Sequence, residues 1–164
     1  KRIFARKDLH ELPTLLDAVK LGDIESIRRL LQWGVSCRDV APGTGMTAVH
    51  IACEKNLPTL VEILLRKDPG AGTIVDKRYN SPLHICAMNG FTSCARAVLD
   101  AGCPPDTKND QQYTALHVAA IKRHPQTCAL LLEYRVDAQA QDGGGRTALH
   151  WAAMSGYEGA CVMY

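Results

Sequence analysis

Four histidines recur along the chain at an almost constant interval, which first suggests a metal site or a catalytic centre. They are His50, His84, His117 and His150, so the steps are 34, 33 and 33 residues. A constant step places each histidine at the same position of a separate structural unit. Neighbouring packed helices lie about 8–10 Å apart, whereas the ligands of one zinc ion each lie about 2 Å from it. The spacing therefore favours structural histidines, each bonded to the backbone or to the hydroxyl of its own turn.

The cysteines also argue against a metal or disulfide framework. There are seven, and none forms a Cys-x-x-Cys pair. Cys53 and Cys86 stand where other copies of the repeat carry alanine, which is typical of small buried side chains. We therefore expect a reducing compartment, cytoplasmic or nuclear.

Signatures of enzymes are missing from the sequence. It contains no G-x-S-x-G, Walker-type, H-E-x-x-H or EF-hand pattern. We expect no enzymatic activity, no cofactor and no bound metal ion. A cysteine nucleophile among the scattered thiols is the alternative that the sequence supports least.

The charge and hydropathy of the chain narrow the classes of partner. Nineteen basic residues against 17 acidic ones give a net charge of +2, far from the strong basicity typical of nucleic-acid-binding domains. No run of 18 apolar residues is present, and residues 1–20 lack the apolar core of a signal peptide. We expect neither a nucleic-acid partner nor membrane insertion.

Each histidine closes a four-residue phrase that is followed by two small residues. The phrases are Thr47-Ala48-Val49-His50, Ser81-Pro82-Leu83-His84, Thr114-Ala115-Leu116-His117 and Thr147-Ala148-Leu149-His150. The small pairs are Ala52-Cys53, Cys86-Ala87, Ala119-Ala120 and Ala152-Ala153. The motif T-P-L-H-x-A at a period of about 33 is the signature of ankyrin repeats. The chain resembles that family over residues 8–164.

The resemblance implies an all-α repeat solenoid. In this family each repeat contributes a short antiparallel helix pair and a projecting β-turn finger. Fingers and first helices line a concave face, and second helices form the convex back. Thr47 is expected to cap a first helix, and Pro58 and Pro82 suit the first position of a helix.

The motif divides the chain into a lead-in and five repeats. Residues 1–7 form a basic lead-in, either a poorly ordered terminus or a docking arm. The repeats span 8–41, 42–75, 76–108, 109–141 and 142–164. The first is degenerate and resembles an N-terminal cap with a polar outer face. The fifth is truncated in its second helix, so we expect the natural chain to continue.

The fourth repeat places arginine where other repeats carry glycine. Arg123 holds the slot between helices that Gly22, Gly90 and Gly156 fill. Arg135 holds the slot after the second helix that Gly34 and Gly102 fill. If both slots need a positive φ, each arginine costs about 1 kcal/mol. We predict that Arg135→Gly raises the melting temperature.

One slot of the first helices predicts a contact surface on the concave face. It holds Glu54 in the second repeat and then Met88, Ile121 and Met154. A row of apolar side chains across adjacent helices is typical of a binding site, and methionine suits adaptable surfaces. The alternative is that these side chains pack between neighbouring helices and widen the core.

Polar residues beside this slot and at the finger tips complete the predicted protein-binding site. They are Lys55, Lys122, Arg78, Tyr79, Tyr113 and Arg146. A loose basic rim would face acidic or phosphorylated groups; it comprises Lys77, Arg78, Lys108, Lys122, Arg123 and Arg146. Interspersed aspartates favour the alternative of a solvated mixed surface. Trp151 is expected in the core with one edge near the groove, and His10 and His124 are expected to face solvent.

Together these features favour a non-enzymatic scaffold or adaptor. It would bind a peptide or a folded partner on its concave face and would be monomeric in solution. The alternative is a regulatory segment of a larger channel, enzyme or signalling protein that acts by intramolecular docking.

Overall fold

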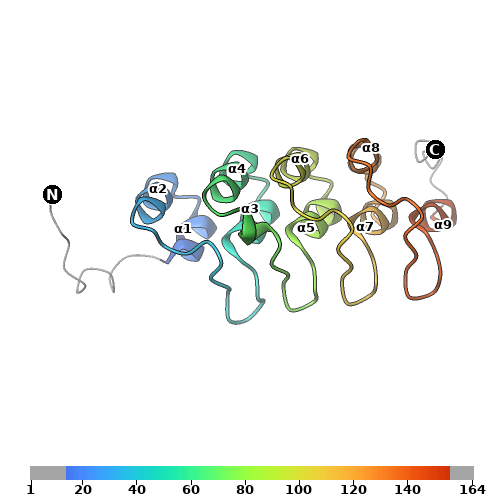
Figure 1. The fold of residues 1–164 in the computed structure, drawn as a ribbon, viewed down its shortest axis with the longest axis horizontal. Coiled ribbons are helices and arrows are strands. Elements are labelled where there is room, and N and C mark those ends of the chain that lie inside the picture. The colour runs from blue at the N-terminus through green and yellow to red at the C-terminus, as the bar shows by residue number, and fades with distance from the viewer. Residues whose placement is uncertain (1–13, 156–164) are drawn as a thin grey trace, which may run out of the picture.

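The computed structural model describes residues 14–155, which form helix pairs stacked side by side (Figure 1). The first repeat contains α1 (Leu15–Leu21) and α2 (Ile24–Gln32), and the second contains α3 (Ala48–Glu54) and α4 (Pro58–Lys67). A short 3-10 turn, η2 (Pro69–Gly72), follows α4. The remaining helices are α5 (Pro82–Asn89), α6 (Thr92–Asp100), α7 (Ala115–Ile121), α8 (Pro125–Glu133) and α9 (Ala148–Met154). The predicted all-α solenoid is confirmed.

Two predicted segments lie outside the described residues. The basic lead-in of residues 1–7 is one of them; it lies, together with His10, in the stretch 1–13. The second helix of the fifth repeat, within residues 156–164, is the other.

The repeated phrase starts each first helix from the second repeat onward. The side chain of Thr47 accepts from the backbone N–H of His50, and His50 Nδ1 accepts from the backbone N–H of Thr47, 3.2 Å away. The same reciprocal cap begins α5, α7 and α9. Pro58 and Pro82 stand at the first helical position, where a missing N–H costs nothing. The predicted cap and both proline positions are confirmed.

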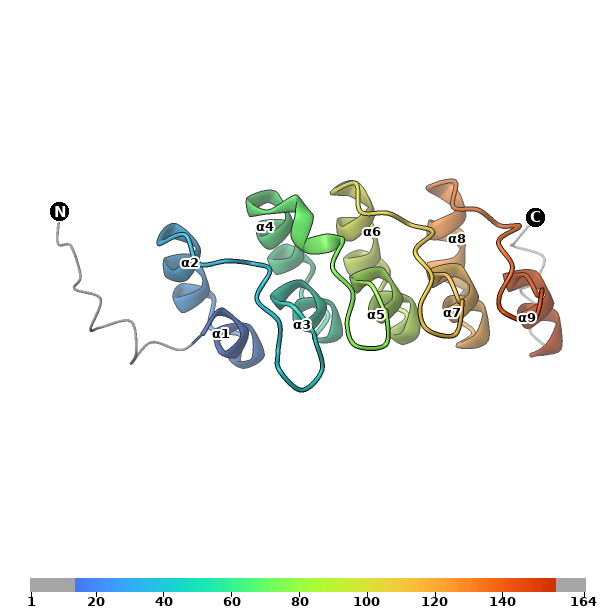
Figure 2. The same cartoon turned by 60° about the horizontal axis from the view of Figure 1, so that its bottom comes forward.

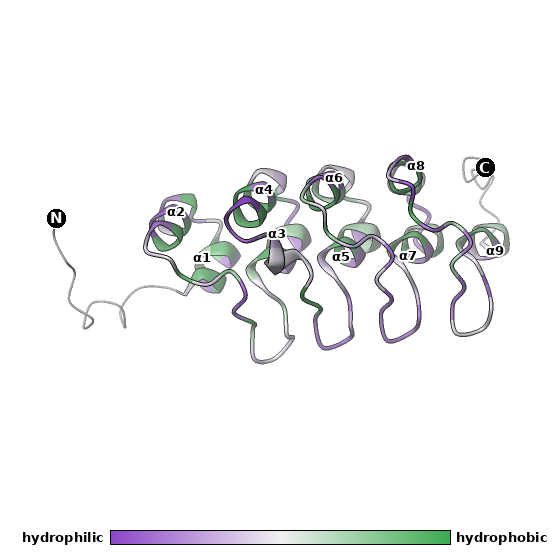
Figure 3. Cartoon of the chain, in the orientation of Figure 1, coloured by the Kyte–Doolittle hydropathy of each residue, from purple (hydrophilic) through white to green (hydrophobic). Residues whose placement is uncertain are grey.

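The helices form two rows, and the fingers project from one side of the stack (Figures 1 and 2). First helices pack in the order α1, α3, α5, α7 and α9, while α4 packs on α6 and α6 on α8. Apolar stretches of both rows alternate with hydrophilic fingers (Figure 3). Leu60, Leu64, Leu83, Leu116 and Leu131 are among the fully buried side chains. Stability therefore comes from contacts between neighbouring repeats.

Both arginine slots of the fourth repeat are left-handed. Arg123 has a φ of 61° and Arg135 a φ of 54°, beside 73° at Gly90 and 75° at Gly102. Gly156 lies outside the described residues. The premise of the predicted arginine strain is therefore confirmed.

Candidate functional site

A groove of about 680 Å³ opens between α5, α7 and the fingers that precede α5 and α7, and Trp151 of α9 closes one end of it. Side chains of the helices supply its apolar part, and the fingers supply most of its polar part. The lining residues are Arg78, Asn80, Met88, Asn109, Asp110, Gln111, Tyr113, Val118, Ile121, Lys122 and Trp151. Five of them, namely Arg78, Met88, Tyr113, Ile121 and Lys122, belong to the site predicted from the sequence.

The apolar row is accessible, but the groove takes in only part of it. Met88 keeps 38% of its surface exposed and Ile121 is half-buried, and both line the groove. Met154, at the end of α9, is 66% exposed and lies outside the lining. The alternative that this row only widens the core therefore does not describe Met88.

Lys55, Tyr79 and Arg146 also lie outside the lining of the groove. Lys55 is the C-cap of α3, one repeat away. Tyr79 is exposed and adopts a φ of 60°. The equivalent finger positions hold Gly45, Gln112 and Gly145, all with positive φ. A tyrosine in this left-handed conformation is strained.

Aromatic rings form one wall of the groove. Tyr113 meets Trp151 edge-to-face at 5.7 Å between ring centroids and stacks on His117 at 5.9 Å. The guanidinium of Arg146 lies 4.2 Å from the centroid of the Trp151 ring. Trp151 is therefore half-buried and lines the groove, whereas the sequence suggested a core residue with one edge near it. Its hydrogen-bonding indole explains the difference.

Asp142 anchors that indole from the last finger. Its carboxylate accepts from Trp151 Nε1 at 2.8 Å and from the backbone N–H groups of Gly144 and Arg146 at 2.8 and 2.9 Å. Burial alone would raise its pKa, but these donors and the Arg146 guanidinium together lower the pKa of Asp142 to about 2. The carboxylate therefore stays charged at neutral pH and fixes the indole.

The predicted basic rim is largely committed to internal contacts. Lys77 Nζ donates to the carbonyl of Pro42 at 2.6 Å, and Lys108 Nζ donates to that of Gln141 at 2.9 Å. Arg123 donates to the carbonyl of Ser155. Arg146 pairs with Asp142 at 3.3 Å. These four residues of the predicted rim therefore make internal contacts, and their contact with a ligand stays a prediction.

Two cations remain available to a ligand in the groove. Arg78 and Lys122 line it and form no ion pair with any residue of the range 14–155. Asp110 lines the same groove and brings one negative charge. The groove is therefore moderately basic, with an apolar floor.

The histidines are structural, as the spacing predicted, and they also join neighbouring repeats. Thr47 and Ser81 hydroxyls lie 2.9 and 2.8 Å from Nδ1 of His50 and His84. Because Nδ1 accepts, Nε2 carries the proton and donates to the next finger. His50 donates to the carbonyl of Asn80 at 3.0 Å and His84 to that of Tyr113 at 2.9 Å. The equivalent bond of His117 reaches Arg146 at 3.0 Å. Sequence reasoning missed these bonds between repeats.

His124 is half-buried, so the expectation that it faces solvent is wrong. Its Nε2 lies 3.2 Å from the carbonyl oxygen of Met88. The ring also lies against Gly90, where an added Cβ would approach Nδ1 to 2.6 Å. His124 therefore holds the end of α5, and with it Met88, in place.

The buried thiols are poorly suited to nucleophilic chemistry. Hydrogen bonding to Cys86 and burial raise the pKa of Cys94, and burial raises the pKa of Cys128 to about 11. Both therefore stay protonated at neutral pH. Within residues 14–155, no three His, Cys, Asp or Glu side chains could share a metal ion. No helix in that part of the chain is long and apolar enough to cross a membrane.

Several groove residues were not predicted from the sequence. They are Asn109, Asp110, Gln111 and Val118. A signal was available, because Asp76, Asn109 and Asp142 recur at a step of 33. Each accepts from backbone N–H groups two and four residues later and so shapes its finger. Such a periodic Asx turn locates the residues that follow it at the finger tip.

The fold defines a class of protein, a solenoid of stacked helical hairpins with projecting fingers. The family model for ankyrin repeats (3 copies) matches residues 15–109 and 83–163. The chain therefore belongs to the ankyrin-repeat family. Ankyrin repeats are protein-interaction modules, so the chain is expected to have protein partners.

Curated relatives share this region but are much longer. The human ankyrin repeat and SOCS box protein 16 is 32% identical over 143 residues, which cover 87% of this chain and 31% of the relative. The human B-cell lymphoma 3 protein is 30% identical over 80% of this chain and 31% of its own length. The E3 ubiquitin-protein ligase KEG of Arabidopsis thaliana is 26% identical over 71% of this chain and 7% of its own. The chain thus spans about a third or less of these relatives.

Proposed function

We propose that the chain is a scaffold or adaptor that binds a peptide or a folded partner in the concave groove. The single observation behind this proposal is the composition of the groove. Accessible Met88 and Ile121, an aromatic wall and two unpaired cations line one hollow. Such a preordered surface loses little conformational entropy on binding, which favours affinity.

The groove favours a particular ligand chemistry. An apolar side chain would pack against Met88, Ile121 and the Tyr113–Trp151 pair, where aromatic and methionine surfaces give contact energy. An acidic or phosphorylated group would meet Arg78 and Lys122, which form no ion pair within the described residues. Tyr79 and Met154, exposed beyond the groove, would extend the contact.

Site-specific photocrosslinking tests this proposal. A photoreactive amino acid at position 88 should attach a partner from a cell lysate. The same amino acid at position 21, an exposed site on α1, should not attach that partner. Equal labelling from both positions would contradict a binding site in the concave groove.

Variants that introduce a carboxylate test the residues that make the contact. In chains without the photoreactive amino acid, Met88→Glu and Lys122→Glu should each abolish capture of the partner identified by crosslinking. Both should leave the melting temperature near that of the parent, because both side chains are exposed. Leu21→Glu serves as the matched surface control. Undiminished capture by both groove variants would remove the proposed anchors.

The relatives support a second proposal, that the chain regulates a larger protein by intramolecular docking. The matched region makes up only 7% to 31% of the three relatives described above. In the complete natural protein, a crosslink from position 88 would then join two parts of one molecule. A crosslinked product with the mass of a single chain supports docking, and a heavier product supports a separate partner.

We also propose that the chain is monomeric and resides in a reducing compartment. Six cysteines in the described range are free and buried, which suits such a compartment. Light scattering after size-exclusion chromatography tests the oligomeric state, and a dimer mass would contradict the proposal.

A further inference from the structure

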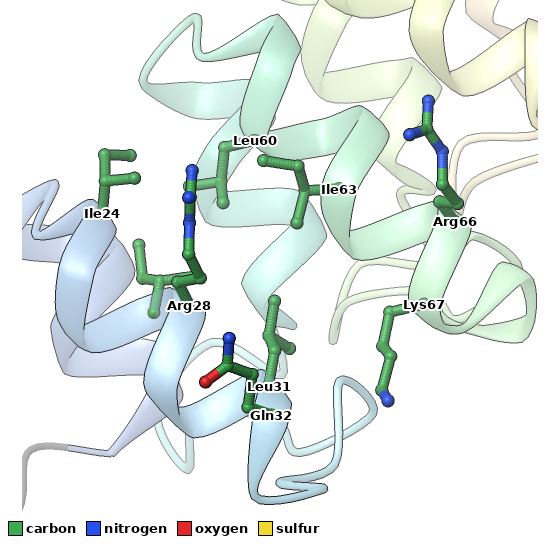
Figure 4. Close-up of a pocket in the computed structure, with 9 residues that line it drawn as sticks. Ile24, Arg28, Leu31, Gln32, Leu60, Ile63, Arg66 and Lys67 are labelled. Carbon is green, nitrogen blue, oxygen red and sulfur yellow. The ribbon is translucent and has the colours of Figure 1, made fainter.

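A second groove lies between α2 and α4, the second helices of the first two repeats (Figure 4). It has a volume of about 380 Å³. Its walls carry five aliphatic side chains: Ile24, Ile27, Leu31, Leu60 and Ile63. Ile24 and Ile63 remain 42% and 39% exposed. The two isoleucines come from the two helices that form the groove, so their exposed surfaces belong to one apolar patch, and a contiguous apolar patch indicates a contact surface.

The groove is open because α2 and α4, the second helices of the first two repeats, stand apart. Helix α4 packs against α6 and α6 against α8, whereas α2 and α4 make no comparable contact. The positions equivalent to Ile63 in the next two repeats are Ala97 and Leu130, which are only 5% and 2% exposed. The same helical face is therefore covered in later repeats and uncovered in the second repeat.

The rim of this groove carries positive charge alone. Arg28, Arg66 and Lys67 are among the nine residues that line it, and none of the nine is acidic. The hollow between α4 and α6 differs, because Glu62 and Asp100 line it together with Arg66. The nearby carboxylate of Asp68 is held by Arg38 at 2.7 and 2.8 Å. Arg28, Arg66 and Lys67 form no ion pair with any residue of the range 14–155, so these cations are available to a ligand in the α2–α4 groove.

We propose that this groove binds an amphipathic helix of a partner protein, with an apolar stripe flanked by carboxylates. Two helices form its walls and satisfy their own backbone groups, so they offer no free strand edge to an extended peptide. A helix laid between them would insert its side chains between theirs, at the usual spacing of about 8–10 Å. Its carboxylates would pair with Arg28, Arg66 and Lys67. This surface is independent of the concave groove.

The basic lead-in of the chain is a poor occupant. Residues 1–7 carry Lys1, Arg2, Arg6 and Lys7 and no acid. The cationic rim would repel them. Charge complementarity therefore favours an acidic partner over this segment.

A binding measurement with a synthetic helix tests the proposal. The probe is a fluorescent peptide of about 18 residues, a length at which helices become populated, with leucines along one face and glutamates beside them. The control peptide carries lysines in place of the glutamates. We expect the complete 164-residue chain to bind the glutamate peptide saturably and the lysine peptide at least tenfold more weakly. Failure to saturate, or equal affinity for both peptides, would overturn the proposal.

Paired variants locate the binding surface. Ile63→Ser and Arg28→Glu should each weaken binding of the glutamate peptide by about tenfold. Leu21→Ser and Arg29→Glu are matched controls, since both side chains are exposed and lie outside the groove lining. Thermal melts check that every variant is folded. An equal loss of affinity in variants and controls would place the peptide elsewhere.

Two further measurements distinguish this proposal from peptide binding in the concave groove and from occupation of the α2–α4 groove by the chain's own N-terminal segment. Met88→Glu should leave the peptide affinity unchanged, because the concave groove is not involved. The methyl resonances of Ile63 should stay unchanged in a Leu9→Ser, Leu12→Ser variant of the complete chain without peptide. A shift of those resonances would show that the chain's own N-terminal segment fills the groove, and would overturn a partner helix as its occupant.

Discussion

At the scale of single residues, five residues other than glycine within the range 14–155 have a positive φ, a backbone conformation that favours glycine. They are Asn56, Tyr79, Gln112, Arg123 and Arg135. Left-handed backbone costs about 1 kcal/mol or more for such residues. The net loss of stability differs among the five residues, because some of their side chains make contacts that offset the strain. Asn56, for example, accepts from the Cys94 thiol at 3.5 Å.

Arg135→Gly should raise the melting temperature by about 2 °C. The backbone at Arg135 has a φ of 54°, and its exposed side chain forms no ion pair with residues of the described range. Removing the strain outweighs the extra freedom of glycine in the unfolded chain. Differential scanning calorimetry measures the change.

Arg123→Gly is the matched control for that prediction. Its backbone has a φ of 61°, but its guanidinium contacts the carbonyl of Ser155. We expect a smaller gain, because the contact is lost together with the strain. A lowered melting temperature for Arg135→Gly would contradict the account of strain.

Tyr79→Gly should stabilise the fold and weaken partner binding together. The substitution relieves a φ of 60° but removes an exposed aromatic side chain from a finger tip. Gln112→Gly changes the equivalent position of the next finger and should stabilise without affecting the partner. Melting curves and capture of the partner found by crosslinking measure both effects. Unchanged capture by Tyr79→Gly would exclude the tyrosine from the site.

At the scale of the elements, one histidine has two roles in each of the second, third and fourth repeats. It caps its own helix and bonds the finger of the following repeat, as His84 does to Tyr113. Burial lowers the pKa of His50, His84 and His117 from the ordinary value of 6.5. The neutral ring is required, because Nδ1 must accept while Nε2 donates. Protonation of one histidine ring would therefore weaken both the helix cap and the contact between repeats.

The free energy of unfolding should fall as the pH drops from 7.5 to 5.5. The unfolded chain takes up protons on these histidines near pH 6.5, whereas the folded chain does so only at lower pH. The stabilisation is therefore complete above pH 6.5 and is lost between 6.5 and the lower folded pKa values. Each histidine adds up to about 1.4 kcal/mol per pH unit in that window. Urea unfolding at pH 7.5, 6.5 and 5.5 measures the slope.

His50→Gln serves as the control for the pH dependence. It removes one of the three titrating groups and should reduce the slope by roughly a third. Asp142, with its pKa of about 2, contributes only at much lower pH. A free energy of unfolding that is constant from pH 7.5 to 5.5 would contradict the prediction.

At the scale of the whole molecule, the stability of the array comes from the interfaces between adjacent repeats. Each repeat touches only the next, so local stability follows the quality of each interface. The interface between the first two repeats is uneven. Helices α1 and α3 pack closely, but α2 and α4 leave a groove. Among the described helices, α2 therefore has the least packing against neighbouring helices.

Amide protons of α2 should exchange with solvent faster than those of α6. Both helices are nine residues long, but α6 packs between α4 and α8. Local opening of α2 breaks fewer contacts and costs less free energy. Hydrogen–deuterium exchange followed by mass spectrometry gives the comparison. Equal protection of the two helices would show that α2 is as well supported as α6. A synthetic helix bound in the groove should slow the exchange of α2.

The sequence alone determined the architecture, because the repeat and its caps are local. The cap between Thr47 and His50 spans three residues, and the left-handed slots of Arg123 and Arg135 can be read by comparing repeats. The position of Met88 in a row of equivalent first-helix slots follows from the same periodicity, whereas its exposure does not. Each of these features depends on the position within a repeat and not on long-range packing.

Only the tertiary structure decided which of those residues share a site. Trp151 and Tyr113 meet although they belong to different repeats, and Arg146 forms an ion pair with Asp142 of its own finger. The opening between α2 and α4 depends on how far two helices stand apart, which no repeat pattern encodes. Periodicity fixes the direction in which a side chain points, but the spacing between neighbouring elements fixes what it meets.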